Sequence, residues 1–190
     1  MENKKALVLF SGGLDSTTVL HHAISKGYIC TALTIDYNQR HSYEIESSKK
    51  YLKKLNLKGN IFKIDLTQIG GSALTDTKIK VPSEMISGIP VTYVPARNTI
   101  FLSIAAAFAE KMYINEIFIG VNQIDYSGYP DCRPDYIDSF KRTINLGTKT
   151  GVDGKKLEIN TPLINMSKKE IIKYGHNMGI DYSQTVSCYQ

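Results

Sequence analysis

A turn near the start of the chain has the residue types needed to hold a phosphate group. Residues 6–18 read ALVLFSGGLDSTT, so an apolar run leads directly into two glycines surrounded by hydroxyl side chains. Gly12 and Gly13 carry no Cβ, which lets backbone N–H groups come close to a ligand. A helix that begins near Ser16 would point its positive end at the same place. The alternative is an ordinary glycine turn in which Asp15 or Ser16 caps the helix.

The elements around this turn predict a parallel α/β sheet. Apolar runs alternate with segments of helical period, and the first and fourth runs are almost wholly apolar, as in central strands covered on both faces. The predicted strands are 6–10, 29–35, 60–66, 116–121 and 157–163. The predicted helices are 16–26, 43–55, 98–113, 134–146 and 167–178. We therefore expect one domain over residues 1–190, a doubly wound five-stranded parallel sheet with helices on both faces.

Signals at the ends of elements support this division. Ser167 and Glu170 form a predicted capping box, and Gly179 follows the end of the last helix. Two irregular segments, 67–95 and 121–133, are longer than usual βα connections, which favours functional loops or lids. In an open α/β sheet the ligand lies beyond the carboxyl ends of the strands. The unusual polar stretches begin there: DYNQRH, VPARNTIFLSIAAAFAE, GVNQIDYSGYPDCRPDYIDSF and TPLINMSKKEII.

Composition excludes several classes of protein. The net charge of +5 permits an anionic partner, although many lysines lie in helical segments and read as solvated surface. Arginine-rich tracts and zinc-finger spacings are absent, so we expect no nucleic-acid module. Neither a signal-peptide core nor an apolar run of membrane-spanning length occurs, which favours a cytoplasmic protein without a membrane partner. Three distant cysteines do not form a disulfide framework.

The turn resembles the SGGxDS signature of the ATP pyrophosphatase (PP-loop) superfamily. The match is SGGLDS, residues 11–16. This resemblance implies an adenine nucleotide alpha hydrolase-like fold in which the loop holds the β- and γ-phosphates of ATP, and a substrate atom is adenylated with release of pyrophosphate. The residues it assigns to ATP binding are Phe10, Ser11, Gly12, Gly13, Leu14, Asp15, Ser16, Thr17, Thr18, Val19 and Leu20.

The remaining polar stretches, with SGYPDCRPDY the most specific, make the chain resemble the 7-cyano-7-deazaguanine synthase family of queuosine biosynthesis from Leu7 to Tyr189. The resemblance implies a homodimeric ATP-dependent ligase that converts 7-carboxy-7-deazaguanine and ammonia into the nitrile. The carboxylate would be adenylated, ammonia would give an amide, and a second activation would allow dehydration. One departure is Asn38, where the family pattern has glycine, and we expect it to change local backbone freedom and little else.

The resemblance also implies roles for individual residues. Expected catalytic residues are Asp15, Arg97, Asp131 and Arg133. Asp15 either helps to hold Mg²⁺ or caps the helix. Arg97 pairs with a phosphate or with the substrate carboxylate, unless its role is structural. Asp131, between two prolines that stiffen the loop, is an expected partner for the base edge of the substrate.

Further contacts remain open at this point. Tyr126 and Tyr129 stack on the substrate ring or pack within the protein. His41 is a substrate contact or a surface histidine. No residue is assigned as general base.

Cys188 is an expected zinc ligand. In the resembling family the SCY motif is followed by a cysteine-rich tail, and four cysteines hold the ion. Structural zinc needs four ligands, whereas Cys30 and Cys132 lack the spacing of a zinc knuckle. We therefore expect a chain that lacks a short cysteine-rich tail, with zinc absent or incompletely held. A lone unliganded cysteine is the alternative.

Two other functions remain open. One is another PP-loop ligase or tRNA-modifying thiolase that acts on a macromolecule. The chain shows neither an appended RNA-binding domain nor suitably spaced paired cysteines, which disfavours it. The other is a non-enzymatic adenine-nucleotide-binding module, which would not need the two long polar loops.

Overall fold

Five parallel strands form one sheet at the centre of the molecule. The computed structural model describes residues 4–39, 43–76, 78–79, 88–122 and 129–185. The strand order is β3-β2-β1-β4-β5, and every neighbouring pair is parallel. The strands are β1 (Lys5–Leu9), β2 (Ile29–Asp36), β3 (Lys58–Lys63), β4 (Glu116–Phe118) and β5 (Glu158–Asn160).

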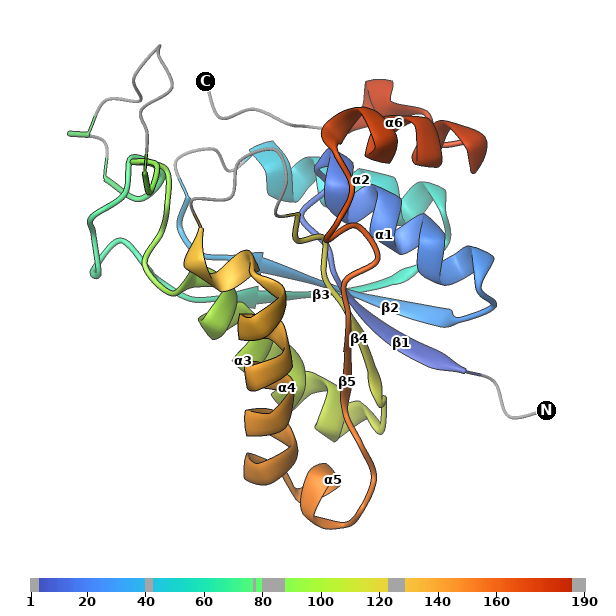
Figure 1. Cartoon of the computed structure of the whole chain (residues 1–190). Helices are drawn as coiled ribbons and strands as arrows, with labels where there is room; N and C mark the ends of the chain where they lie inside the picture. Colours follow the sequence, from blue (N-terminus) through green and yellow to red (C-terminus); the bar gives the residue numbers. More distant parts are fainter. Residues whose placement is uncertain (1–3, 40–42, 77, 80–87, 123–128, 186–190) are drawn as a thin grey trace.

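Helices cover both faces of the sheet, which confirms the predicted fold class. The helices are α1 (Leu14–Ser25), α2 (Tyr43–Lys54), α3 (Arg97–Met112), α4 (Pro134–Gly147), α5 (Lys149–Val152) and α6 (Lys168–Asn177), with 3₁₀ turns η1 (Pro130–Cys132) and η2 (Tyr182–Gln184). Helices α1, α2 and α6 lie on one face, and α3 and α4 lie on the other (Figure 1). In the described part of the chain, no helix combines the length and the apolarity that crossing a membrane requires.

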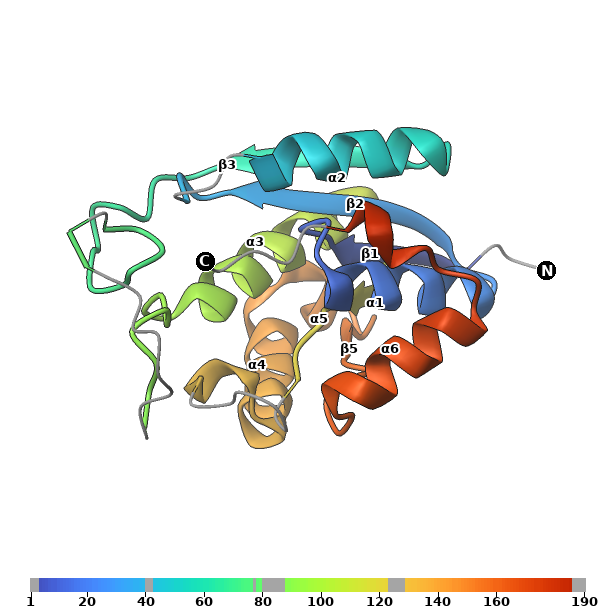
Figure 2. The ribbon, with the colours of Figure 1, turned by 90° about the horizontal axis from the view of Figure 1, so that it is seen from above.

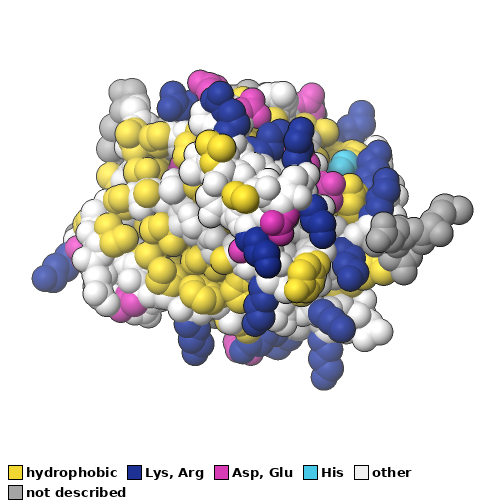
Figure 3. Space-filling model, turned by 90° about the horizontal axis from the view of Figure 1, so that it is seen from below, with side chains coloured by type: hydrophobic (Ala, Val, Ile, Leu, Met, Phe, Trp, Pro, Cys, Tyr) yellow, Lys and Arg dark blue, Asp and Glu magenta, His cyan; other side chains and the backbone are white. Residues whose placement is uncertain are grey.

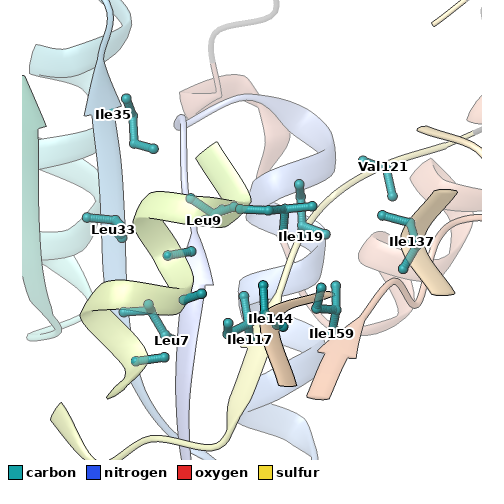
Figure 4. Packing of buried hydrophobic residues seen from close by; sticks show 14 of the residues in the cluster. Leu7, Leu9, Leu33, Ile35, Ile117, Ile119, Val121, Ile137, Ile144 and Ile159 are labelled. Carbon is teal, nitrogen blue, oxygen red and sulfur yellow. The ribbon is translucent and has the colours of Figure 1, made fainter. Parts of the chain in front are cut away.

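Two hydrophobic clusters fix the helices to the sheet because strand side chains alternate between its faces. Leu7 and Leu9 of β1 pack toward α3 and α4 together with residues of the neighbouring strands (Figure 4). Ala6, Val8 and Phe10 pack on the opposite face, against α1, α2 and α6. Central strand β1 is therefore buried on both faces, as its apolar sequence predicted.

Several predicted segments differ from the structure. The third, fourth and fifth strands end earlier than predicted, at Lys63, Phe118 and Asn160. Residues 161–164 form a turn, and Pro162, which lacks an N–H, cannot extend the ladder. Helix α5 was not predicted. Within the long segment 67–95, Leu74 and Val94 belong to the hydrophobic core. Part of that segment is therefore packed against the rest of the domain and does not form a lid.

The chain order places a topological switch beside β1. From β1 the chain builds β2 and β3 on one side, and it later returns to build β4 and β5 on the other side. At such a point the connections after two adjacent strands diverge and leave a crevice at the carboxyl edge. The connection after β1 is the SGGLDS turn, residues 11–16.

Candidate functional site

Serine hydroxyls hold the loop after β1, here called the PP-loop (residues 11–16), in shape. The Ser16 hydroxyl donates to the Gly13 carbonyl at 3.1 Å and accepts from the Ser11 N–H at 3.2 Å. The Ser11 hydroxyl oxygen lies 3.1 Å from that of Ser16 and accepts from the Gly13 N–H at 3.3 Å. Hydrogen bonds of the loop's own serine side chains therefore maintain its conformation.

Helix α1 begins at Leu14, slightly earlier than predicted, and Gly13 is its N-cap residue. Gly13 provides no side-chain hydrogen bond to the first turn, and neither Asp15 nor Ser16 occupies the cap position. The capping alternative for these two residues is therefore wrong. A helix start without a side-chain cap can bind an anion through its N–H groups and its dipole.

Asp15, in the first turn of α1, forms an ion pair with the start of α6. Lys168 Nζ lies 2.8 Å and 2.9 Å from the two carboxylate oxygens of Asp15. Both side chains are partly exposed, at 43% for Lys168 and 28% for Asp15. A Cβ on Gly120, just after β4, would lie 3.1 Å from backbone atoms of Asp15 and Ser16. Glycine at position 120 therefore lets the end of β4 approach the PP-loop.

The predicted ATP-binding segment contains two kinds of residue. Phe10, Val19 and Leu20 are buried in the hydrophobic core, so their side chains anchor the two ends of the loop to the sheet and to neighbouring helices. Thr17 and Thr18 are also fully buried. Among the described residues, the Thr17 hydroxyl finds no hydrogen-bond partner, whereas Thr18 donates to the Leu14 carbonyl at 2.8 Å.

A second group of predicted site residues lies at the start of α3. Asp131 is 4% exposed, and its Oδ2 accepts the Asn98 N–H at 2.9 Å. The Asn98 amide returns hydrogen bonds to the Asp131 carbonyl and to Cys132 Sγ, at 3.3 Å and 3.2 Å. The carboxylate of Asp131 thus caps the first turn of α3 and joins η1 to it.

Arg97 projects from the same turn and lies between two aromatic rings. Its guanidinium carbon is 6.0 Å from the Phe101 ring centroid and 5.9 Å from that of Tyr129. Ala96 has a left-handed conformation, with φ of 53°, and its N–H donates to the Tyr93 hydroxyl at 3.0 Å. This uncommon conformation for a non-glycine residue sets the direction in which α3 begins. Tyr129 packs on Tyr93, with ring centroids 5.6 Å apart.

Burial governs ionisation in this second group. Desolvation raises the pKa of Asp131, although the Asn98 N–H and the charge of Arg97 oppose that rise. Desolvation likewise raises the pKa of Glu44 at the start of α2, where the charge of Arg97 again opposes it. The Cys132 thiol has a pKa raised to about 11 by burial. It is therefore protonated near neutral pH and is not a thiolate nucleophile.

Other predicted residues have simpler outcomes. Arg133 is exposed, and its Nε donates to the Pro130 carbonyl at 3.2 Å. Tyr126, His41 and Cys188 lie outside the described residues. Asn38 has a φ of 62°, the left-handed region that suits glycine, and its amide also contacts Asp65 Oδ1 at 3.4 Å. Asn38 therefore adds a link between the ends of β2 and β3, which is more than the change in backbone freedom we expected.

The described residues do not assemble a zinc site. Cys30 and Cys132 belong to hydrophobic clusters on opposite faces of the sheet. In the described part of the chain, no three residues of the types His, Cys, Asp or Glu come close enough together to hold a metal ion. Magnesium is a different case, because proteins commonly hold it with one or two carboxylates plus substrate phosphates. Asp15, in the first turn of α1, is a carboxylate of that kind, and in this structure both of its oxygens are paired with Lys168.

Two residues of the site were missed by sequence reasoning. Lys168 was assigned to the solvated surface, yet it pairs with Asp15. A usable signal was its position directly after the capping Ser167, because a lysine in a first turn is disfavoured by the helix dipole unless an anion lies nearby. Tyr182, whose hydroxyl contacts Thr18 at 2.7 Å, carried no local signal, because the contact spans 164 residues.

Comparisons with known proteins give a consistent result. A family model described as "Queuosine biosynthesis protein QueC" matches residues 5–190. A 7-cyano-7-deazaguanine synthase from Saccharophagus degradans is 56% identical over 191 residues, which cover 100% of this chain and 85% of that protein.

More distant solved structures share the fold. A 4-thiouridine synthetase in complex with RNA and bound ATP has a TM-score of 0.62 at 18% identity, covering 98% of this chain and 43% of that one. An NH3-dependent NAD synthetase from Campylobacter jejuni has a TM-score of 0.51 at 16% identity, covering 96% and 66%. At these identities the likeness concerns the fold alone.

Proposed function

The chain belongs to the queuosine biosynthesis protein QueC family, and from that membership we propose that it is an ATP-dependent 7-cyano-7-deazaguanine synthase. Its substrates are 7-carboxy-7-deazaguanine and ammonia. The observation that carries the proposal is 56% identity to a synthase of that name along the whole chain. The start of α1 after β1, with glycine as its N-cap residue and beside the topological switch, supports a nucleotide site at the same place.

The proposed reaction twice converts a substrate oxygen, first of the carboxylate and then of the amide, from a poor leaving group into a good one. A carboxylate oxygen attacks the α-phosphate of ATP, which gives an acyl adenylate and pyrophosphate. Ammonia then displaces AMP and leaves an amide. A second adenylation, in which the amide oxygen attacks another ATP and pyrophosphate is released, lets that oxygen depart as part of AMP, and loss of the two N–H protons leaves the nitrile. The protein's contribution is chiefly to position the reactants and to stabilise phosphate charge.

The PP-loop is the proposed phosphate site. The N–H groups at the start of α1 and the Ser11 and Ser16 hydroxyls are donors of the kind that phosphate oxygens accept. Lys168 adds a positive charge beside them through its pair with Asp15. Magnesium, when bound, supplies charge neutralisation between the phosphates, and Asp15 is the carboxylate proposed to hold it.

The start of α3 is the proposed substrate site. Arg97 offers a guanidinium for the substrate carboxylate or for a phosphate, and the ring of Tyr129 lies next to it, with its centroid 5.9 Å from the guanidinium carbon. Because Asp131 is buried and hydrogen-bonded to Asn98, the placement of Arg97 depends on it. Direct contact of Asp131 with the base edge, and a catalytic part for Arg133, stay predictions.

Two further features are proposed on family resemblance. One is a homodimer. Tyr113, Leu146 and Val152, which lie at the ends of α3 and α4 and in α5, are exposed hydrophobic residues. Separately, the face of the molecule seen from below carries a broad group of hydrophobic side chains (Figure 3). The other is zinc, with Cys188 as a ligand. The described residues offer no site for it, so no step of the reaction is assigned to zinc.

A pyrophosphate-release assay tests the proposed enzyme class. We expect release from ATP only when both 7-carboxy-7-deazaguanine and the chain are present. Release that requires tRNA would favour a tRNA-modifying enzyme. Nucleotide binding without any turnover would favour a non-enzymatic module.

A further inference from the structure

One stripe of α1 carries three polar side chains that all face the C-terminal part of the chain. Asp15, Thr18 and His22 are spaced by three and four residues, so they lie on the same side of the helix. Their partners are Lys168 at 2.8 Å, the Tyr182 hydroxyl at 2.7 Å and the Tyr174 hydroxyl at 2.6 Å. After α6, the chain runs back toward the start of α1 (Figure 2).

The contact of Tyr182 reaches the PP-loop itself. The Thr18 hydroxyl donates its proton to the Leu14 carbonyl at 2.8 Å. The Thr18 oxygen also lies 2.7 Å from the Tyr182 hydroxyl, and either hydroxyl can be the donor in this contact. The Tyr182 hydroxyl is also within donating distance of the Ile171 carbonyl of α6, at 3.3 Å. Thr18 is fully buried. A continuous chain of hydrogen bonds therefore runs from η2 to the first residue of α1.

A glycine makes this contact possible. Gly175 lies in α6, and a Cβ built there would stand 1.7 Å from the Tyr182 hydroxyl oxygen. Glycine inside a helix costs about 1 kcal/mol relative to alanine. Its presence at this position is explained by the space that the Tyr182 ring needs to reach Thr18.

From this geometry we infer that Tyr182 is a positioning residue for the nucleotide site. By fixing Thr18, and through it the carbonyl of Leu14, it sets the first turn of α1 relative to α6, which carries Lys168. The inference rests on the proposed function, because it takes the PP-loop to be the site of ATP.

The test compares two tyrosines of the same interface. Tyr182→Phe removes the hydroxyl that reaches the PP-loop residue Leu14 through Thr18. Tyr174→Phe removes the hydroxyl that reaches His22, two helical turns further along α1. Tyr174→Phe loses its contact with His22, whereas Tyr182→Phe loses its contact with Thr18 and the 3.3 Å hydrogen bond to the Ile171 carbonyl. A merely structural role therefore predicts a fall in melting temperature for each variant but similar ATP affinity for both.

Calorimetric titration of a non-hydrolysable ATP analogue into the whole chain separates these cases. We expect Tyr182→Phe to weaken binding about three- to tenfold, the equivalent of one hydrogen bond, and Tyr174→Phe to weaken it less than about twofold. Equal affinities in the two variants, with the unaltered chain binding normally, would overturn this inference alone. An unaltered chain that fails to bind the analogue would overturn the proposed function as well.

A double-variant cycle provides an independent readout. Thr18→Val breaks the same hydrogen bond from its other end. If Tyr182 acts through Thr18, combining Tyr182→Phe with Thr18→Val weakens binding no further than Thr18→Val does alone. Fully additive losses would contradict the inference, because they would mean that the two hydroxyls act separately.

Discussion

Gly12 and Gly13 are adjacent, yet they are glycines for different physical reasons. Gly12 has a φ of 80°, and a Cβ there would lie 3.2 Å from the backbone of Ser48 in α2. Gly13 has a φ of −79°, which any residue adopts. The backbone conformation therefore requires glycine at position 12 but not at position 13, where we attribute the glycine to the ligand that the loop is proposed to hold.

Valine substitutions separate these two requirements. Gly13→Val should abolish ATP binding while the melting temperature changes little, because the new side chain occupies the space of the phosphates. Gly12→Val should destabilise the fold by about 1–3 kcal/mol or more, because backbone strain is joined by crowding of the new side chain against Ser48. Calorimetric titration and thermal unfolding measure the two effects. A folded Gly13→Val variant with unchanged ATP affinity would show that the loop does not hold the nucleotide.

Asp131 should affect the substrate site more than the nucleotide site. Asp131→Ala removes the hydrogen bond that caps α3 at Asn98, which costs about 1–2 kcal/mol of stability. We expect the loss to loosen Arg97, which directly precedes Asn98. We expect weaker binding of 7-carboxy-7-deazaguanine with ATP affinity retained. Asp135 is an exposed carboxylate at the start of α4, so Asp135→Ala is the matched control. It should change neither the binding of 7-carboxy-7-deazaguanine nor the affinity for ATP. Loss of ATP affinity with substrate binding intact would mean that the two sites are exchanged.

At the scale of elements, α1 is held on both sides by histidine–tyrosine pairs. His21 Nε2 lies 2.9 Å from the Tyr51 hydroxyl of α2, and His22 Nδ1 lies 2.6 Å from the Tyr174 hydroxyl of α6. Burial lowers the pKa of both histidines, and Lys26 lowers that of His22 further. The neutral imidazole rings therefore connect α1 to α2 and to α6.

This arrangement predicts loss of stability in mild acid. A histidine whose pKa is lower in the folded state than in the unfolded state stabilises the fold above its unfolded pKa. That stability is lost as the pH falls through the folded value. The melting temperature should therefore drop between about pH 7.5 and about pH 5.5. Replacing His21 and His22 by glutamine should flatten this drop. An equally steep drop in the double variant would assign it to other groups.

Local patterns predicted the elements better than the contacts between them. The capping box of Ser167 and Glu170 forms as expected, because both partners lie within one helical turn. The apolar run of β1 and the glycines after it also placed the loop correctly. The position of Lys168 could indicate that an anion lies nearby, but not that this anion is Asp15, because the two residues are 153 positions apart and only the sheet order brings α1 and α6 together.

The role of Asp131 shows a similar limit. The sequence places it in a stiff loop, which favoured contact with a ligand. The structure shows its carboxylate turned inward onto Asn98, 33 residues away. Which way a loop side chain points depends on tertiary packing, and no local pattern in the loop indicates it.

At the scale of the whole molecule, the sheet order places the proposed sites at one edge. The PP-loop follows β1, and Gly120 follows β4, its neighbour across the switch. Helices on both faces bury the sheet and leave its carboxyl edge for loops. The fold is shared with proteins of other activities, so it narrows the chemistry without fixing the substrate.

Association can be measured on the unmodified chain. We expect a mass in solution of twice the chain mass of 21.2 kDa by light scattering. Because Leu146 is 82% exposed, Leu146→Glu tests whether the apolar face of α4 and α5 takes part. A mass of one chain at all concentrations would remove the homodimer. A dimer unaffected by Leu146→Glu would place the interface elsewhere.

The most direct test of the central claim is to identify the product. The chain is incubated with ATP, Mg²⁺, ammonia and 7-carboxy-7-deazaguanine, and the small molecules are analysed by mass spectrometry. We expect 7-cyano-7-deazaguanine to form, with the amide as a transient species, and neither to form when ATP is omitted. An active preparation that consumes ATP but leaves 7-carboxy-7-deazaguanine unchanged would contradict the proposed function.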